Sequence, residues 1–242
     1  MPGHSTRADI GRTVDVRLPP GYDASRPEPY SLLVMHDGQN LFASRAEARG
    51  GSWHADETIG RLVTEGQIPP LVLLAIDHGD AKRIHEFTPT RVMELGGGGA
   101  PDYAEAVFSA IATVADEYHV RTDVDGLAMA GSSLGGLVTL WMASTHPGRF
   151  GRLIAMSPSV WWDRRMLLRQ LRRHPIDPAT RIWIDAGGRE RRSVARDARA
   201  VRDVLSGQGV RTLQYVEDPE GGHDEASWGR RLAAALTWLY QS

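Results

Sequence analysis

The chain has 242 residues, a formal net charge of −2 and no cysteine. Acidic and basic residues are mixed along it, which speaks against nucleic acid or an anionic membrane surface as a partner. The lack of cysteine excludes disulfides, thiolate metal sites and a cysteine nucleophile. The length fits one α/β domain, and we expect residues 1–242 to form it.

The N-terminus lacks the apolar core of a signal peptide, and no window holds about 18 uninterrupted apolar residues. We therefore expect a cytoplasmic protein without a membrane segment. A homo-oligomer is compatible with the sequence but not indicated by it.

The first half of the chain predicts strands and helices in alternation. Residues 12–18 alternate between apolar and polar and are followed by two prolines, which predicts an edge strand with one solvent-exposed face. Residues 30–36 and 71–76 are apolar runs of β-forming residues, typical of central parallel strands. Residues 55–62 between them predict a helix.

A polar, irregular stretch follows Asp77 and ends in four glycines at 96–99. We expect a long mobile loop here, lying over one end of the sheet and carrying substrate contacts. Apolar residues at three- and four-residue spacing then predict an amphipathic helix, namely Tyr103, Val107, Ala110, Ile111 and Val114.

The second half continues the alternation. Short strands are predicted at 153–156, 181–185 and 212–217, and helical faces run through 194–205 and 228–239. Strands alternating with helices on short connections imply an α/β fold, with a mostly parallel central sheet covered by helices on both faces.

The most informative motif is Gly131-Ser132-Ser133-Leu134-Gly135, between an apolar strand and a helix-forming run. This Gly-x-Ser-x-Gly pattern is the nucleophile elbow, where a serine sits on a strained turn and the glycines let neighbouring backbone pass close by. The alternative is an ordinary strand–turn–helix in which the glycines only allow close packing and Ser133 has no catalytic role. We take Ser133 as the candidate nucleophile, which requires a base and an acid.

The base should follow the serine and come after a strand, because ligands meet the carboxyl ends of parallel strands. Of nine histidines, three follow Ser133: His146, His174 and His223. The first two end predicted helices, whereas His223 follows the last strand in a flexible Gly-Gly-His turn. His223 is therefore the candidate base, although a solvent-facing loop histidine would look the same.

Two carboxylates can serve as the acid. Asp185 ends a strand, and Glu190 lies further along the loop that follows it. We favour Glu190, because the longer arm lets its carboxylate turn toward the histidine, and leave Asp185 open. An oxyanion hole needs two backbone N–H groups, for which Leu134 and Gln39 are the candidates.

Together these segments resemble the esterase family of the α/β-hydrolases that includes enterochelin, feruloyl and acetyl-xylan esterases, S-formylglutathione hydrolases and mycolyltransferases. The resemblance rests on residues 35–42, 86–89, 130–136, 150–163 and 221–228. It implies an α/β-hydrolase fold and acyl transfer through Ser133, with His223 as base, an acid in the segment of Glu190, and the amides of Gln39 and Leu134. The sequence of residues 36–40, His-Asp-Gly-Gln-Asn, resembles that of the enterochelin-esterase branch of the family.

Three tryptophans are candidates for a substrate pocket. Trp161 and Trp162 follow a predicted strand, and one of them could equally belong to the core; Trp53 is a further wall candidate. Histidine and aspartate also occur as neighbours at 36–37, 54–56 and 78–80, but without the spacing of a known metal motif. We expect neither a metal nor another cofactor.

The sequence thus predicts a serine esterase that acts on a small-molecule ester through an acyl-enzyme. An acyltransferase would use the same residues and pass the acyl group to an alcohol. A non-catalytic binding protein on this scaffold is a third possibility, which the retained nucleophile, base and acid disfavour.

Overall fold

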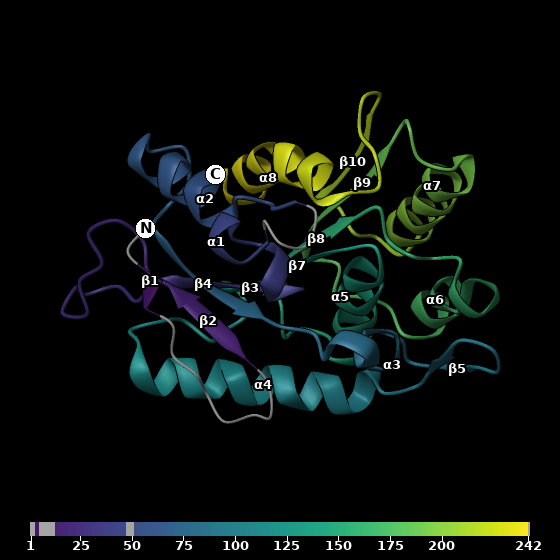
Figure 1. Ribbon diagram of the computed structural model, residues 1–242, viewed down its shortest axis with the longest axis horizontal. Helices are drawn as coiled ribbons and strands as arrows, with labels where there is room; N and C mark the ends of the chain where they lie inside the picture. Colours follow the sequence, from purple (N-terminus) through teal and green to yellow (C-terminus); the bar gives the residue numbers. More distant parts are fainter. Residues whose placement is uncertain (1–2, 5–12, 47–50, 242) are drawn as a thin grey trace.

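A computed structural model describes residues 3–4, 13–46 and 51–241. It shows a large central sheet with helices on both faces (Figure 1). The N-terminal stretch that bears on a signal peptide, and residue 12 of the first predicted strand, lie outside the described residues. Among the helices that are described, none is long and apolar enough to cross a membrane.

The sheet has eight strands in the order β1-β2-β4-β3-β7-β8-β9-β10. The first two pairings, β1 with β2 and β2 with β4, are antiparallel, and all the others are parallel. The strands are β1 (Gly3–His4), β2 (Val14–Arg17), β3 (Ser31–His36), β4 (Leu71–Ile76), β7 (Leu127–Ser132), β8 (Arg152–Met156), β9 (Arg181–Gly187) and β10 (Leu213–Asp218). Because β1 pairs outside β2, the prediction that β2 is the edge strand is wrong.

Successive side chains of the buried strands point alternately into two hydrophobic cores, one on each face of the sheet. In β3, Leu32 and Val34 join one core, whereas Leu33 and Met35 join the other. This follows from the two-residue period of a strand, and a strand buried on both faces is apolar throughout. The apolar runs of β3 and β4 are explained in this way.

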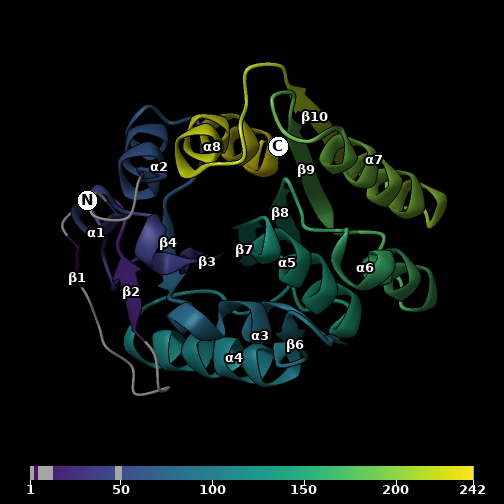
Figure 2. The ribbon, with the colours of Figure 1, turned by 45° about the vertical axis from the view of Figure 1, so that its right-hand side comes forward.

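The helices divide between the two faces (Figures 1 and 2). Helices α2 (Ala55–Thr64) and α8 (Glu225–Tyr240) pack against each other on one face, and their apolar residues belong to the same core. The other face is covered by α4 (Ala100–Glu117), α5 (Leu134–Thr145), α6 (Trp162–Arg173) and α7 (Arg192–Gly207). The predicted helical faces in α4, α7 and α8 all point into these cores, and the predicted helix at 55–62 corresponds to α2.

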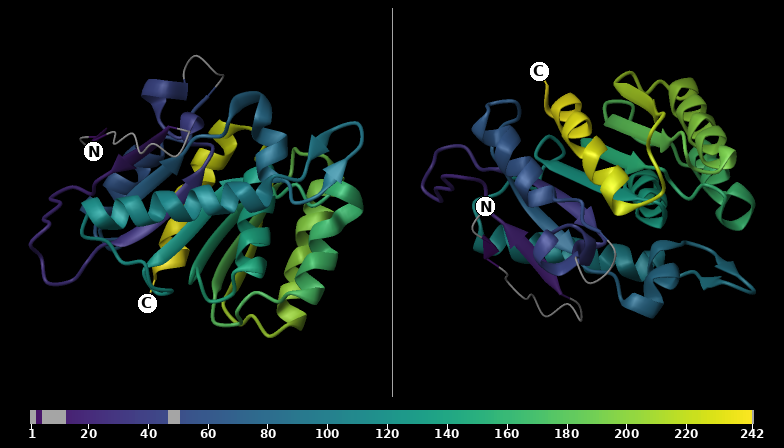
Figure 3. Two further views of the ribbon diagram at one scale, coloured as in Figure 1. Left: turned by 90° about the horizontal axis from the view of Figure 1, so that it is seen from below. Right: turned by 45° about the horizontal axis from the view of Figure 1, so that its top comes forward.

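The stretch after β4 differs from the predicted long loop. It contains the 3-10 turn η3 (Asp80–Lys82), the short helix α3 (Arg83–Phe87) and a hairpin of β5 (Arg91–Val92) and β6 (Gly96–Gly97). The hairpin extends away from the sheet (Figure 3). Two further short elements, η1 (Gly38–Asn40) and α1 (Ala43–Ala46), follow β3. Both segments therefore begin at the carboxyl ends of neighbouring parallel strands.

Candidate active site

Ser133 occupies a strained turn between β7 and α5. Its φ of 55° and ψ of −118° lie in a region that serine rarely adopts, so the surrounding structure must hold it there. The Ser133 amide donates to the Met156 carbonyl (2.9 Å), and its carbonyl accepts from the Ser159 amide (2.9 Å). A Cβ at Gly131 would lie 2.6 Å from the carbonyl carbon of Gly135. Gly131 is thus required by the tightness of the turn, and a Cβ at Gly135 would lie 3.2 Å from Oδ2 of Asp37.

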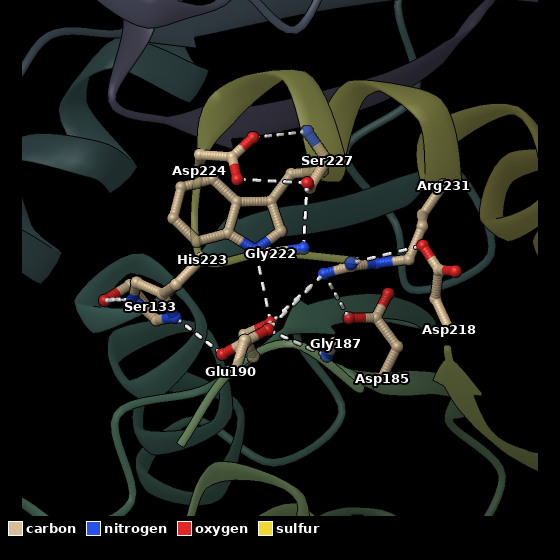
Figure 4. A network of polar contacts seen from close by, with 12 residues as sticks. Ser133, Asp185, Gly187, Glu190, Asp218, Gly222, His223, Asp224, Ser227 and Arg231 are labelled. Atoms are coloured by element: carbon tan, nitrogen blue, oxygen red, sulfur yellow. Dashed lines mark hydrogen bonds and ion pairs between the residues drawn. The ribbon is translucent and has the colours of Figure 1, made fainter. Parts of the chain in front are cut away.

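The structure brings Ser133, His223 and Glu190 into one hydrogen-bonded row (Figure 4). Nε2 of His223 lies 2.9 Å from the Ser133 hydroxyl, and its Nδ1 lies 2.7 Å from Oε2 of Glu190. The imidazole ring also meets the Trp228 ring edge to face at 4.9 Å. With Nδ1–H donating to Glu190, the tautomer leaves Nε2 free to accept the serine proton.

Glu190 is held on both of its oxygens. Oε2 faces His223, while Oε1 accepts hydrogen bonds from the Ser157 hydroxyl (2.5 Å) and the Gly187 amide (2.8 Å). Burial by itself raises the pKa of this carboxyl, but these hydrogen bonds outweigh it and lower the pKa below its ordinary value. The carboxylate therefore stays ionised and oriented at neutral pH.

Asp185, the other candidate acid, is fully buried and turned away from His223. Its Oδ2 accepts a hydrogen bond from the Trp183 indole (3.0 Å), and its Oδ1 lies 3.1 Å from Nη2 of Arg231. Burial raises the pKa of Asp185. The Asp185 carboxylate is thus engaged by Trp183 and Arg231, whereas the loop after β9 brings Glu190 to the histidine.

The two candidate oxyanion amides lie at the starts of helical turns. Leu134 begins α5, and Gln39 lies within η1, directly after β3. N–H groups at a helix start have no acceptor within the helix, so they can donate to a ligand. The Gln39 side chain bonds both backbone groups of His78 (3.2 Å each), which ties this turn to the segment after β4.

An ion pair between Arg83 and Asp37 fixes the residue that precedes the turn η1. Arg83 of α3 binds both carboxylate oxygens of Asp37 (2.6 and 2.8 Å), and Asp37 itself has a left-handed backbone with φ of 58°. A bidentate arginine–carboxylate pair fixes orientation as well as distance. The segment predicted as a loop therefore holds the turn that carries Gln39 in place.

Two depressions meet at His223. The larger, about 520 Å³, is lined by Trp161, Glu190, Arg191, Ser193, Val194 and His223. The smaller, about 290 Å³, reaches Ser133 and is lined by Asp37, Asn40, Trp53, His78, Arg83, Ser132, Ser133, His223, Glu225 and Trp228. His223 is thus the residue that the two depressions share.

The three candidate tryptophans occupy different places. Trp161 is 51% exposed and lines the larger depression. Trp53 is almost fully buried, packs near Trp228 (6.0 Å between rings) and lines the smaller one. Trp162 does not fit its predicted role, because it is fully buried in the core and donates its indole N–H to Thr90.

The histidines with neighbouring aspartates make hydrogen bonds within the protein. Nδ1 of His36 lies 2.7 Å from the Tyr103 hydroxyl, Nδ1 of His54 lies 3.2 Å from Glu57, and Nδ1 of His78 accepts from the Asp80 amide. In the part of the chain that the structure describes, no group of three or more His, Cys, Asp or Glu side chains could hold a metal ion.

Three residues of this region were not predicted. Ser159 places its hydroxyl 3.1 Å from that of Ser133, and Ser157 and Arg231 contact the Glu190 carboxylate or its partners. Arg231 had a detectable signal, since it follows Trp228 by three residues and so falls on the apolar face of its helix.

The fold and the serine elbow define an α/β-hydrolase. The family model described as "Putative esterase" matches residues 5–239, and the chain belongs to this family of carboxylic ester hydrolases. An uncharacterized protein of Bacillus subtilis, YbbA, is 24% identical over 95% of this chain and 92% of its own length. The iron(III) enterobactin esterase of Escherichia coli K12 is 29% identical over 72% of this chain, but the match spans only 43% of that longer protein.

Solved structures agree with this membership. The enterobactin esterase FES of Shigella flexneri, crystallised in the presence of enterobactin, superposes with a TM-score of 0.81 and 26% identity, covering 100% of this chain and 59% of that one. The BES protein of Bacillus cereus has the same fold, with a TM-score of 0.80, 15% identity, and coverage of 99% and 96%.

Proposed function

We propose that this protein is a serine esterase that works through an acyl-enzyme, with residues 1–242 acting as one hydrolase domain. The observation that carries the proposal is the hydrogen-bonded row of Ser133, His223 and Glu190, with contacts of 2.9 and 2.7 Å. These are the lengths expected between a nucleophile, its base and the acid that orients the base.

In the first step, His223 takes the Ser133 proton on Nε2 while the serine oxygen bonds to the ester carbon. The carbonyl oxygen becomes an oxyanion, which the amides of Gln39 and Leu134 stabilise. His223 then donates its proton to the departing alcohol oxygen as the old ester bond breaks, leaving the acyl group on Ser133. Glu190 stays ionised throughout and stabilises the imidazolium.

In the second step, water gives a proton to His223 and adds to the acyl carbon. The tetrahedral intermediate collapses, the serine oxygen recovers the proton from His223, and the carboxylic acid leaves. An acyltransferase would differ only in using an alcohol in place of water, so analysis of the products with and without an added alcohol separates the two reactions.

Siderophore esters are the natural first substrates to test, because several relatives carry that activity in their names. The larger depression, with the Trp161 ring, Val194 and Arg191, suits an aromatic group that carries oxygen substituents. The chain spans less than half the length of the enterobactin esterases that it matches in sequence. A panel should therefore also include p-nitrophenyl, feruloyl and acetyl-sugar esters.

The direct test combines a fluorophosphonate probe with peptide mass spectrometry and turnover of p-nitrophenyl acetate. We expect the probe on Ser133, and a loss of turnover of about 10⁴-fold or more in Ser133→Ala. Ser206→Ala, which replaces a surface serine on α7, is the matched control. It should retain both the label on Ser133 and the turnover of p-nitrophenyl acetate. Parent-like turnover by Ser133→Ala, or absence of label on folded protein, would overturn the proposal.

A further inference from the structure

Arg231 is a buried cation with no part in the steps above. It lies on the inner face of α8 with 6% of its side chain exposed, beside Asp185, which is fully buried. Burying a charge is costly unless it is paired and hydrogen-bonded. Its contacts with residues around Glu190 point to a use in the active site.

The Arg231 guanidinium contacts residues at or near the carboxyl ends of three neighbouring strands (Figure 4). Its Nη2 donates to the Ser157 hydroxyl (3.1 Å), after β8, and lies 3.1 Å from Oδ1 of Asp185, on β9. The same nitrogen lies 4.0 Å from Oε1 of Glu190, and Nη1 lies 3.6 Å from Asp218 of β10. One cation thus holds together the strand ends that carry Glu190 and His223.

Ser157 relays this interaction to Glu190. Its hydroxyl donates its single proton to Oε1 of Glu190 (2.5 Å) and accepts from Nη2 of Arg231 (3.1 Å) and from the Trp228 indole (3.2 Å). One donor and two lone pairs are all that a hydroxyl offers, so Ser157 is fully used. With Oε1 fixed, Oε2 of Glu190 is turned toward His223.

Two glycines make room for this arrangement. A Cβ at Gly221 would lie 2.3 Å from Nη1 of Arg231, and a Cβ at Gly187 would lie 2.3 Å from the Gly221 carbonyl oxygen. The loops that carry Glu190 and His223 therefore cross in direct backbone contact over the guanidinium. The Gly-Gly-His turn is shaped around Arg231 as well as around His223.

We propose that Arg231 is a positioning residue, which acts through Ser157 to hold the Glu190 carboxylate toward His223 and to balance its charge. This role rests on the proposed function. Arg231 lines neither depression, so it acts on the rate of the chemical steps and not on substrate binding.

Arg231 is one of several charged or titratable groups around His223. The others are Glu190 and Asp185 on the β9 side, Asp218 on β10, Asp224 and Glu225 at the start of α8, Arg191 in the larger depression, and Asp37, His78 and Arg83 in the smaller one. A variant that changes Arg231 alone would also remove the nearest cation from the fully buried Asp185, and this would disturb the site by itself.

The experiment therefore compares Asp185→Asn with the double variant Asp185→Asn/Arg231→Met. Both variants carry asparagine at position 185, so neither has a carboxylate there that needs a cationic partner. The double variant therefore differs from the single variant only in lacking the Arg231 cation. We expect kcat to fall about tenfold from the single to the double variant, with KM unchanged, which corresponds to about 1.4 kcal/mol of transition-state stabilisation.

The split between kcat and KM is the readout that separates positioning from a purely structural role. A displaced Glu190 carboxylate slows the chemical steps and lowers kcat, whereas a generally loosened site would also raise KM. Ser157→Ala, which cuts the relay while keeping every charge, should lower kcat in the same way. Thermal unfolding confirms that each variant is folded.

Arg202→Met in the Asp185→Asn background is the matched control, since Arg202 is an exposed arginine of α7 paired with Asp203. It should leave kcat and KM as in Asp185→Asn. If the double variant also matches Asp185→Asn in both, Arg231 is not a positioning residue. That result differs from failure of the proposed function, in which the probe would not label Ser133 of the parent protein.

Discussion

At the scale of single residues, Trp161 and Trp162 show how neighbours in sequence come to lie in different environments. Trp161 is half exposed beside His223, whereas Trp162 fills the core and bonds Thr90. A large aromatic ring at the rim of a depression offers stacking area to a ligand.

We expect Trp161→Ala to raise KM about tenfold for aromatic esters, a loss of about 1.4 kcal/mol of binding, with little change in kcat. Trp162→Phe is the matched control: it removes the indole N–H that Thr90 accepts, so it should lower the unfolding temperature and leave KM unchanged. Steady-state kinetics and thermal unfolding measure both. An unaltered KM in Trp161→Ala would remove this residue from the substrate site.

The sequence was sufficient to select the candidate residues whose positions follow from local pattern. Ser133 lies in a short motif, and His223 is the one histidine after it that follows a strand. The choice between Glu190 and Asp185 depended on which carboxylate the loop after β9 turns upward, and that is a matter of tertiary contacts from Ser157 and Gly187. The same limit applied to Arg231, whose partners come from three separate segments.

At the scale of elements, the elbow depends on close approach of β7 and α5. A Cβ at Gly131 would meet the Gly135 carbonyl at 2.6 Å and the His36 ring at 2.9 Å. Backbone on one side and a fully packed ring on the other leave no path for relief.

Gly131→Ala should therefore destabilise the fold by about 3 kcal/mol and reduce activity by displacing Ser133. Gly207→Ala is the matched control, because Gly207 ends α7 with open space around it and no left-handed φ. That variant should be neutral or more stable by less than about 1 kcal/mol. Urea unfolding of both variants is the measurement, and equal stabilities would contradict a steric requirement at the elbow.

The segment after β4 marks where prediction of elements stopped. Its helix and hairpin are too short to show periodicity, and they are fixed by distant partners: Arg83 binds Asp37, and Trp162 binds Thr90. Three consecutive residues, Gly96 to Gly98, have positive φ and shape the hairpin end. Local sequence carries little information about such contacts, whereas the long strands and helices follow from their periodic apolar faces.

At the scale of the whole molecule, six parallel strands end at one edge of the sheet, and each contributes to the candidate site or its support. The site therefore depends on the stability of the entire sheet, and the sheet contains a buried histidine beside it. His36 ends β3, is almost fully buried, and faces Tyr103; burial lowers its pKa to about 4.

This histidine should make the fold sensitive to acid. Its pKa is about 4 in the folded state against 6.5 as the ordinary value, so between these pH values the unfolded chain binds a proton that the folded chain does not. Stability is therefore lost as the pH falls from about 6.5 toward 4, and the loss reaches about 2 kcal/mol at pH 5. Between pH 7.5 and pH 5, the free energy of unfolding of His36→Gln should fall by about 2 kcal/mol less than that of the parent, as measured by urea unfolding at both pH values.

His174→Gln, at an exposed position after α6, is the control and should show the same fall in the free energy of unfolding as the parent. An equal acid loss in His36→Gln and the parent would mean that protonation of His36 does not couple to unfolding, and the acid sensitivity of the sheet would then have to come from its carboxylates.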